Sequence, residues 1–131
     1  MEDKINAASL PSVAALAFLG DAVYSLHIRA RAVNAGLIKS GDLHDAASRY
    51  VSAHAQAQAM RAIRPHLRPL EEDICRRAGN STHLRHPHHA TVADYRAATA
   101  LEAVLGLLYY LGDRERLEEL LAMTHIADGE T

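Results

Sequence analysis

Apolar residues recur at the spacing of an α-helix along most of this chain of 131 residues. Val13, Leu16 and Val23 follow that period near the N-terminus, and Leu101 and Leu108 follow it in the C-terminal half. Alanine is abundant, whereas the chain holds only 7 glycines and 4 prolines and has no β-branched runs. Hydrophobic residues make up 49% of the chain, enough for one domain with a core. We therefore expect an all-α fold in a single domain over residues 1–131.

Helix-breaking residues divide the apolar pattern of the chain into five predicted helices. They are expected at about residues 11–33, 40–63, 69–80, 92–111 and 114–123. The sequence NAG at residues 34–36 ends the first, Pro65 ends the second, and Gly112 ends the fourth. Ser40 or Asp42 is expected to cap the second helix. The first nine residues and those after 123 are expected to be loose ends.

Charge is distributed unevenly along the chain. The net charge of −2 argues against a simple nucleic-acid binder, but residues 61–96 hold seven arginines against four acids, a net charge of +3.

The single cysteine, Cys75, cannot form an internal disulfide. The longest apolar run, residues 13–20, is too short to span a bilayer, and the flank MEDKIN lacks the positive charge of a secretory signal. We expect a cytoplasmic protein with no membrane association.

Two carboxylates interrupt the most apolar helices. Asp21 lies in LAFLGDAVY directly after Gly20, and Glu102 lies in ALEAVLG with Gly106 one turn later. If the two helices pack together, both acids could face one cleft, where a cation such as Mg²⁺ would offset their repulsion. The alternative is that each acid lies at the edge of its amphipathic stripe, solvated or paired with an arginine. Spacing alone leaves both interpretations open.

Four blocks of sequence resemble the ribonuclease III family. LAFLGDAVY resembles the family signature, and TALEAVLGLLYYLGD resembles its second conserved block. LHDAASRYVSAHAQAQAM and the segment from RRAGN to YRAATALEAVLG resemble the Mini-ribonuclease III branch, which has the catalytic domain without a double-stranded RNA-binding domain. The resemblance covers about residues 11–122.

The resemblance implies a homodimer of ribonuclease III catalytic-domain folds that cleaves double-stranded RNA, leaving 5′-phosphate and 3′-hydroxyl ends. It implies that Asp21 and Glu102 are the catalytic residues and the ligands of Mg²⁺, with Mn²⁺ as a substitute metal. The implied substrate is a stem in precursor 23S ribosomal RNA, with a ribosomal protein as a candidate stimulating partner. Ala14, Ala17 and Thr99 stand where larger family members carry further acids, which fits the reduced set of the mini branch.

Several polar residues are candidates for RNA binding. They are Arg76, Arg77, Asn80, Arg85, Arg96, Gln56 and His54. His54 replaces a lysine common in the branch, so its charge at pH 7 depends on its pKa.

His44 is a weaker site candidate, with a structural hydrogen bond near a helix start as the alternative. The sequence HLRHPHH at residues 83–89 suggests zinc, but its spacing does not match a tetrahedral set, and we favour an exposed loop near the RNA.

Two other functions fit the same residues. One is a non-catalytic RNA-binding or scaffold protein that keeps the fold. The other is a helical dimerisation module whose alanine-rich helix packs on a partner. Nuclease assays on duplex RNA, with and without Mg²⁺, separate these from an endoribonuclease.

Overall fold

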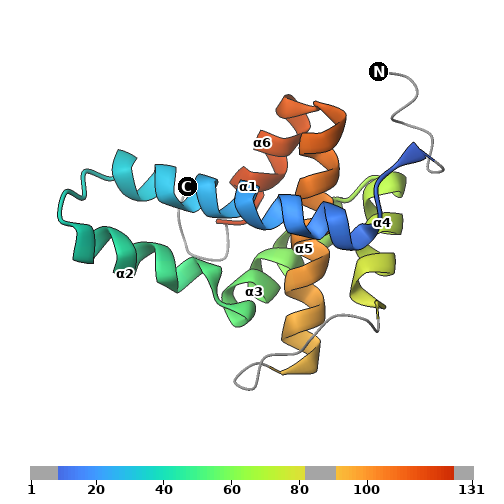
Figure 1. Ribbon diagram of the computed structural model, residues 1–131, viewed down its shortest axis with the longest axis horizontal. Coiled ribbons are helices and arrows are strands. Elements are labelled where there is room, and N and C mark those ends of the chain that lie inside the picture. The colour runs from blue at the N-terminus through green and yellow to red at the C-terminus, as the bar shows by residue number, and fades with distance from the viewer. Residues whose placement is uncertain (1–8, 82–90, 126–131) are drawn as a thin grey trace.

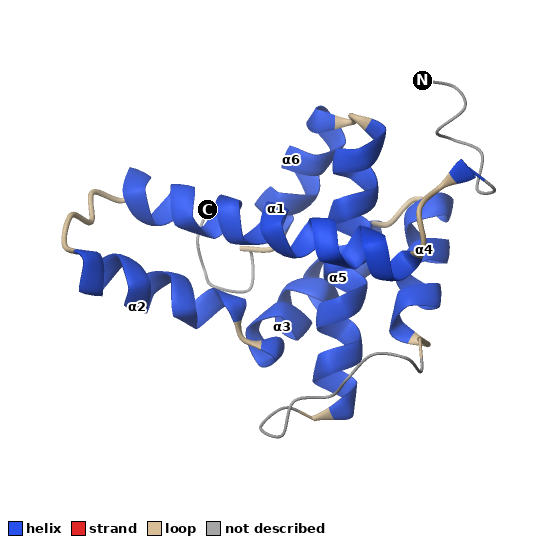
Figure 2. Ribbon diagram, viewed as in Figure 1, coloured by secondary structure: helices blue, strands red, loops and turns tan. Residues whose placement is uncertain are grey.

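The computed structural model describes residues 9–81 and 91–125, and all regular structure within them is helical (Figure 2). The elements are α1 (Val13–Asn34), α2 (Ser40–Val51), α3 (Ala53–Ile63), the short 3₁₀ helix η3 (Arg64–His66), α4 (Pro69–Gly79), α5 (Val92–Leu111) and α6 (Arg114–Met123). Helix α1 crosses α5 at the centre of the molecule (Figure 1). Helices α3, α4 and α6 also pack on α5, while α2 lies beside the C-terminal half of α1. The all-α prediction is confirmed.

Four of the five predicted helices agree with the structure to within about two residues. Ser12 caps α1 by accepting a hydrogen bond from the Ala15 N–H at 3.1 Å. Gly112 ends α5 in the left-handed region, with φ 77°. The predicted loop at residues 82–90 and the predicted loose ends at 1–8 and 126–131 lie outside the described residues.

The prediction of one helix over residues 40–63 is wrong. The backbone is extended at Ser52, with φ −65° and ψ 155°, and this residue separates α2 from α3. The Ser52 hydroxyl accepts a hydrogen bond from the Ala55 N–H at 3.1 Å and so caps a new helix. The predicted cap was also wrong, because Lys39 occupies the N-cap position of α2 without a side-chain hydrogen bond.

The core surrounds α5. From residue 98 to residue 108, every residue of this helix except Glu102 is buried. One side packs on α1, α3 and α6 through residues such as Ile28, Ile63 and Leu120, and the other packs on α1 and α4 through Leu16 and Ile74. A helix buried on all sides is apolar on all sides, which explains why Glu102 stands out in the sequence.

Two glycines set the distance between α1 and α5. A Cβ built on Gly20 would lie 1.6 Å from the backbone oxygen of Glu102, and one built on Gly106 would lie 1.9 Å from the backbone oxygen of Leu16. Both distances are far shorter than any real Cβ contact. The helices therefore touch backbone to backbone, and only glycine fits at either position.

A buried ion pair joins α4 to α6. The Arg116 guanidinium donates to both carboxylate oxygens of Glu71 at 2.8 Å and to the backbone oxygen of His66 at 2.8 Å, and Glu119 is a further partner. Burial alone would raise the pKa of Glu71, but hydrogen bonds from Arg116 and from the Arg68 backbone outweigh it and hold the pKa below its usual range. The network anchors α4, whose last turn carries Arg76 and Arg77.

By length and composition α1 resembles a membrane span, with 22 residues and a mean hydropathy of 1.2 over its best 18-residue window. A single such helix is weak support for a span, because core helices of soluble proteins show the same pattern. Here α1 packs on α5 and α4.

Substituting alanine at the crossing should destabilise the fold. We expect Gly20→Ala or Gly106→Ala to lower the free energy of unfolding by about 3 kcal/mol or more, because the new methyl group meets fixed backbone. Urea denaturation followed by circular dichroism measures this. Gly41→Ala is the matched control, since a Cβ at exposed Gly41 in α2 has nothing within 4 Å. Equal midpoints for all three variants would contradict the backbone contact.

Candidate active site

Asp21 and Glu102 lie together where α1 crosses α5. Gly20 rests on the backbone oxygen of Glu102, so the neighbouring Asp21 is brought beside the Glu102 side chain, and the two carboxyl groups form a hydrogen bond. Asp21 is exposed and Glu102 is half-buried. Both line a hollow of about 610 Å³, here called the acid hollow, which also involves the α2–α3 junction and the first half of α5. The expectation that both acids face one cleft agrees with this geometry.

The pKa of the Glu102 carboxyl lies well above its usual range. Burial, the hydrogen bond with Asp21 and the charge of Asp21 together raise the pKa of Glu102 to about 8, while a hydrogen bond from Gln56 opposes the rise. At neutral pH Glu102 is therefore largely protonated. Asp21 and Glu102 are the residues that would hold a divalent cation, whose positive charge would offset their repulsion.

The chemistry of the donors fits a hard cation that keeps much of its water. Carboxylate oxygens are the ligands that Mg²⁺ prefers. Within residues 9–81 and 91–125, no group of three or more His, Cys, Asp or Glu side chains is arranged to hold a metal ion. Thr99 supplies no carboxylate at this position, and its hydroxyl donates a hydrogen bond to the Tyr95 backbone oxygen at 3.0 Å. The site thus offers two carboxylates, which suits Mg²⁺ with bound waters better than zinc.

Gln56 is a buried side chain in the wall of the acid hollow. Its side chain is only 5% exposed, and its Nε2 donates to the Val51 backbone oxygen at 3.0 Å and to Glu102. The sequence prediction made Gln56 an RNA contact. The structure does not support it as a surface donor, because its amide hydrogens are used inside the protein.

A second charged group lies at the rim of the acid hollow. His54 Nδ1 lies 3.0 Å from Asp94 Oδ2, and Arg61 donates to Asp94 Oδ1 at 3.3 Å. The hydrogen bond with His54 is the main reason that the pKa of Asp94 lies below its usual range, and Arg61 adds to it. The His54 side chain is 68% exposed and remains available to a ligand. Sequence reasoning found His54 but missed Asp94 and Arg61, which are 40 and 33 residues from their partners.

Four of the residues predicted to bind RNA lie where α4 ends beside α5. Arg76, Arg77, Asn80 and Arg96 are all exposed. The close approach of the helices is visible at Gly79, where a Cβ would lie 3.8 Å from the Arg96 backbone oxygen. Both Arg76 and Arg77 pair with the single acid Asp73, at 2.6 and 3.6 Å, so the cluster keeps a net positive charge. Arg85 lies outside the described residues, and RNA binding by this set stays a prediction.

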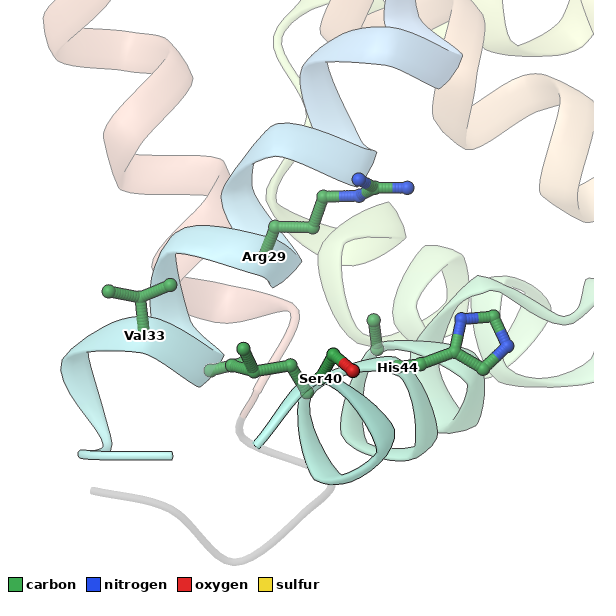
Figure 3. Close-up of a pocket in the computed structure, with 7 residues that line it drawn as sticks. Arg29, Val33, Ser40 and His44 are labelled. Carbon is green, nitrogen blue, oxygen red and sulfur yellow. The ribbon is translucent and has the colours of Figure 1, made fainter. Parts of the chain in front are cut away.

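His44 lies elsewhere. It is exposed on α2 and borders a mostly apolar hollow of about 310 Å³ between α1 and α2, together with Arg29, Val33 and Ser40 (Figure 3). Its backbone oxygen accepts a hydrogen bond from the Ser48 hydroxyl at 2.8 Å. His44 is not among the residues that line the acid hollow, so the structure does not bring it to Asp21 and Glu102.

Known proteins resemble the chain over nearly its whole length. The family model of the ribonuclease III domain matches residues 14–113. Mini-ribonuclease 3 of Brevibacillus brevis is 42% identical over 117 residues, which cover 88% of this chain and 87% of that protein. Mini-ribonuclease 3 of Symbiobacterium thermophilum is 41% identical over 116 residues, 88% of each chain. A crystal structure of a protein from Fusobacterium nucleatum superimposes with a TM-score of 0.82 at 31% identity, over 89% of this chain and 90% of that one.

The raised pKa of Glu102 makes the stability of the protein depend on pH. A carboxyl whose pKa rises on folding stabilises the fold below its unfolded pKa, and this contribution is lost as the pH rises toward the folded pKa, here from 4.5 to about 8. In EDTA we expect Glu102→Gln to melt about 4 °C or more above the wild type at pH 9, with the difference shrinking toward pH 5. Differential scanning calorimetry checks this. Exposed Glu118→Gln on α6 is the control and should follow the wild type at each pH.

Proposed function

The chain belongs to the Mini-ribonuclease III branch of the ribonuclease III family and is an endoribonuclease, and from this premise we propose that it hydrolyses double-stranded RNA with Mg²⁺ held by Asp21 and Glu102. One observation carries the proposal: two acids from different helices meet in the acid hollow, where their carboxyl oxygens are the kind of ligand that a hard divalent cation prefers. Mn²⁺ is proposed as a substitute metal, because its preferences for oxygen ligands are similar.

The side chains around the acid hollow have distinct tasks in this reaction. When bound, Mg²⁺ supplies the positive charge that offsets the developing charge on the phosphate and lowers the pKa of a water. Asp21 and Glu102 supply the carboxylates, and Gln56 donates a hydrogen bond to Glu102. Water attacks phosphorus and the bond to the 3′-oxygen breaks, which leaves 5′-phosphate and 3′-hydroxyl ends.

The basic residues support binding of a duplex by shape. A-form RNA offers phosphates and 2′-hydroxyl groups across a shallow minor groove, and these are read without base specificity. Arg76, Arg77, Asn80 and Arg96 line the junction of α4 and α5, and His54 stands at the rim of the acid hollow. We propose that this set contacts the RNA backbone. A stem in precursor 23S ribosomal RNA is the proposed substrate, a ribosomal protein a candidate stimulating partner, and the cytoplasm the proposed location.

An apolar stripe on α1 supports a homodimer. Phe18, Leu26 and Val33 lie on one side of the helix and are 85, 69 and 61% exposed, and Ile38 follows at 89%. Monomeric proteins rarely leave such residues together in water, so a partner surface is expected. A two-fold dimer would present two acid hollows, one for each strand of a duplex.

Removing the acid function should separate cleavage from binding. We expect Asp21→Asn and Glu102→Gln to lower the cleavage rate of a labelled duplex by about a thousandfold in Mg²⁺, because the cation loses a charged ligand. Duplex binding, measured by filter retention in EDTA, should stay within about threefold of the wild type and weaken with added salt. Glu118→Gln should cleave normally. Cleavage by Asp21→Asn at the wild-type rate would contradict the proposed catalytic role of Asp21 and favour a non-catalytic RNA-binding or dimerisation protein.

Charges placed on the apolar stripe should yield monomers. Phe18→Glu combined with Leu26→Glu would bury two carboxylates in the interface, so we expect light scattering to report half the wild-type mass. Cleavage of a duplex should then drop or leave nicks in single strands. Ala122→Glu, at an exposed position on α6, is the control and should keep the wild-type mass. An unchanged mass for the double variant would exclude this face as the interface.

A further inference from the structure

The break between α2 and α3 changes the hydrogen bonds of two backbone groups. In a continuous helix the Val51 backbone oxygen would accept from the Ala55 N–H four residues later. Here the Ala55 N–H donates to the Ser52 hydroxyl at 3.1 Å instead. The Val51 oxygen accepts from the Gln56 side-chain Nε2 at 3.0 Å. Ser52 and Gln56 together replace the bond that the break removes.

Gln56 also reaches the candidate active site. The same Nε2 group that binds Val51 donates to Glu102, and both partners are acceptors. An amide nitrogen has two hydrogens, so these two contacts use its full capacity and fix which way the amide is turned. The side chain is only 5% exposed.

The other half of the amide is left unsatisfied. Gln56 Oε1 is fully buried and accepts no hydrogen bond from residues 9–81 or 91–125. Buried polar atoms without partners are rare, because removing them from water is unfavourable. An apolar side chain of the same size would avoid this cost. The glutamine is therefore explained by what its N–H groups hold, which is the Glu102 carboxylate and the junction at Val51.

We propose that Gln56 is a positioning residue that fixes the Glu102 carboxylate for the divalent cation, using the break at Ser52 as its anchor. This inference rests on the proposed function, since it assumes that Glu102 binds a cation. Residues that orient a metal ligand typically change metal affinity by ten- to a hundredfold when they are replaced. Gln56 touches neither substrate nor cation in this proposal.

The test compares Gln56→Met and Gln56→Asn with the wild type. Methionine has the size of glutamine without its donors, and asparagine keeps the amide but is one methylene too short to span Val51 and Glu102. Mn²⁺ binding, followed by electron paramagnetic resonance, should weaken about tenfold in both variants. The Mg²⁺ concentration for half-maximal cleavage should rise by a similar factor, and excess Mg²⁺ should restore most of kcat. Duplex affinity in EDTA should not change.

Gln58→Met is the matched control, because Gln58 is exposed on the same helix. It should keep wild-type Mn²⁺ affinity. A merely structural role for Gln56 predicts a lower melting temperature and weaker duplex binding, with no rescue by Mg²⁺. That result, or unchanged Mn²⁺ affinity in both Gln56 variants, would overturn the inference. Wild-type protein that neither binds Mn²⁺ nor cleaves RNA would instead refute the proposed function and this inference with it.

Discussion

The contact of Gly20 with Gly106 is the constraint on which the rest of the structure depends. It lets two long helices touch through their backbones, so that α5 can be buried between α1, α3 and α4. The same contact places Asp21 beside Glu102, because Gly20 lies directly on the Glu102 backbone oxygen. Fold and active site therefore share one geometric requirement. A helix pair held apart by even one methyl group could not bring these carboxylates into hydrogen-bond contact.

The helices could be predicted from the sequence for a physical reason, whereas the joint role of the two acids was predicted from the resemblance to the ribonuclease III family. Apolar residues at helical spacing record which faces are buried, and a carboxylate that breaks such a face is visible without a structure. The break at Ser52 could not be found in this way. Ser, Ala and Gln on both sides are compatible with a continuous helix, and the choice is made by hydrogen bonds of the Ser52 hydroxyl and the Gln56 amide.

The ion pairs that sequence reasoning missed, at the site and in the fold, are all long-range. Asp94 holds His54 and Arg61 across 40 and 33 residues, and Glu71 meets Arg116 across 45 residues. No periodic pattern records such partners, because each residue alone looks like a solvated surface charge. Gln56 shows the reverse error. Its polarity suggested a surface contact, but its position on α3 buries it.

The break at Ser52 has a consequence for how motion reaches the active site. Helix α2 has no buried residue, whereas α3 buries five, so the chain changes at this point from a peripheral arm to a part of the core. The Val51 oxygen belongs to the arm, and the amide that binds it also binds Glu102. A tilt of the arm therefore strains a hydrogen bond that orients a carboxylate. The position of α2 and the orientation of Glu102 are thus joined through a single amide group.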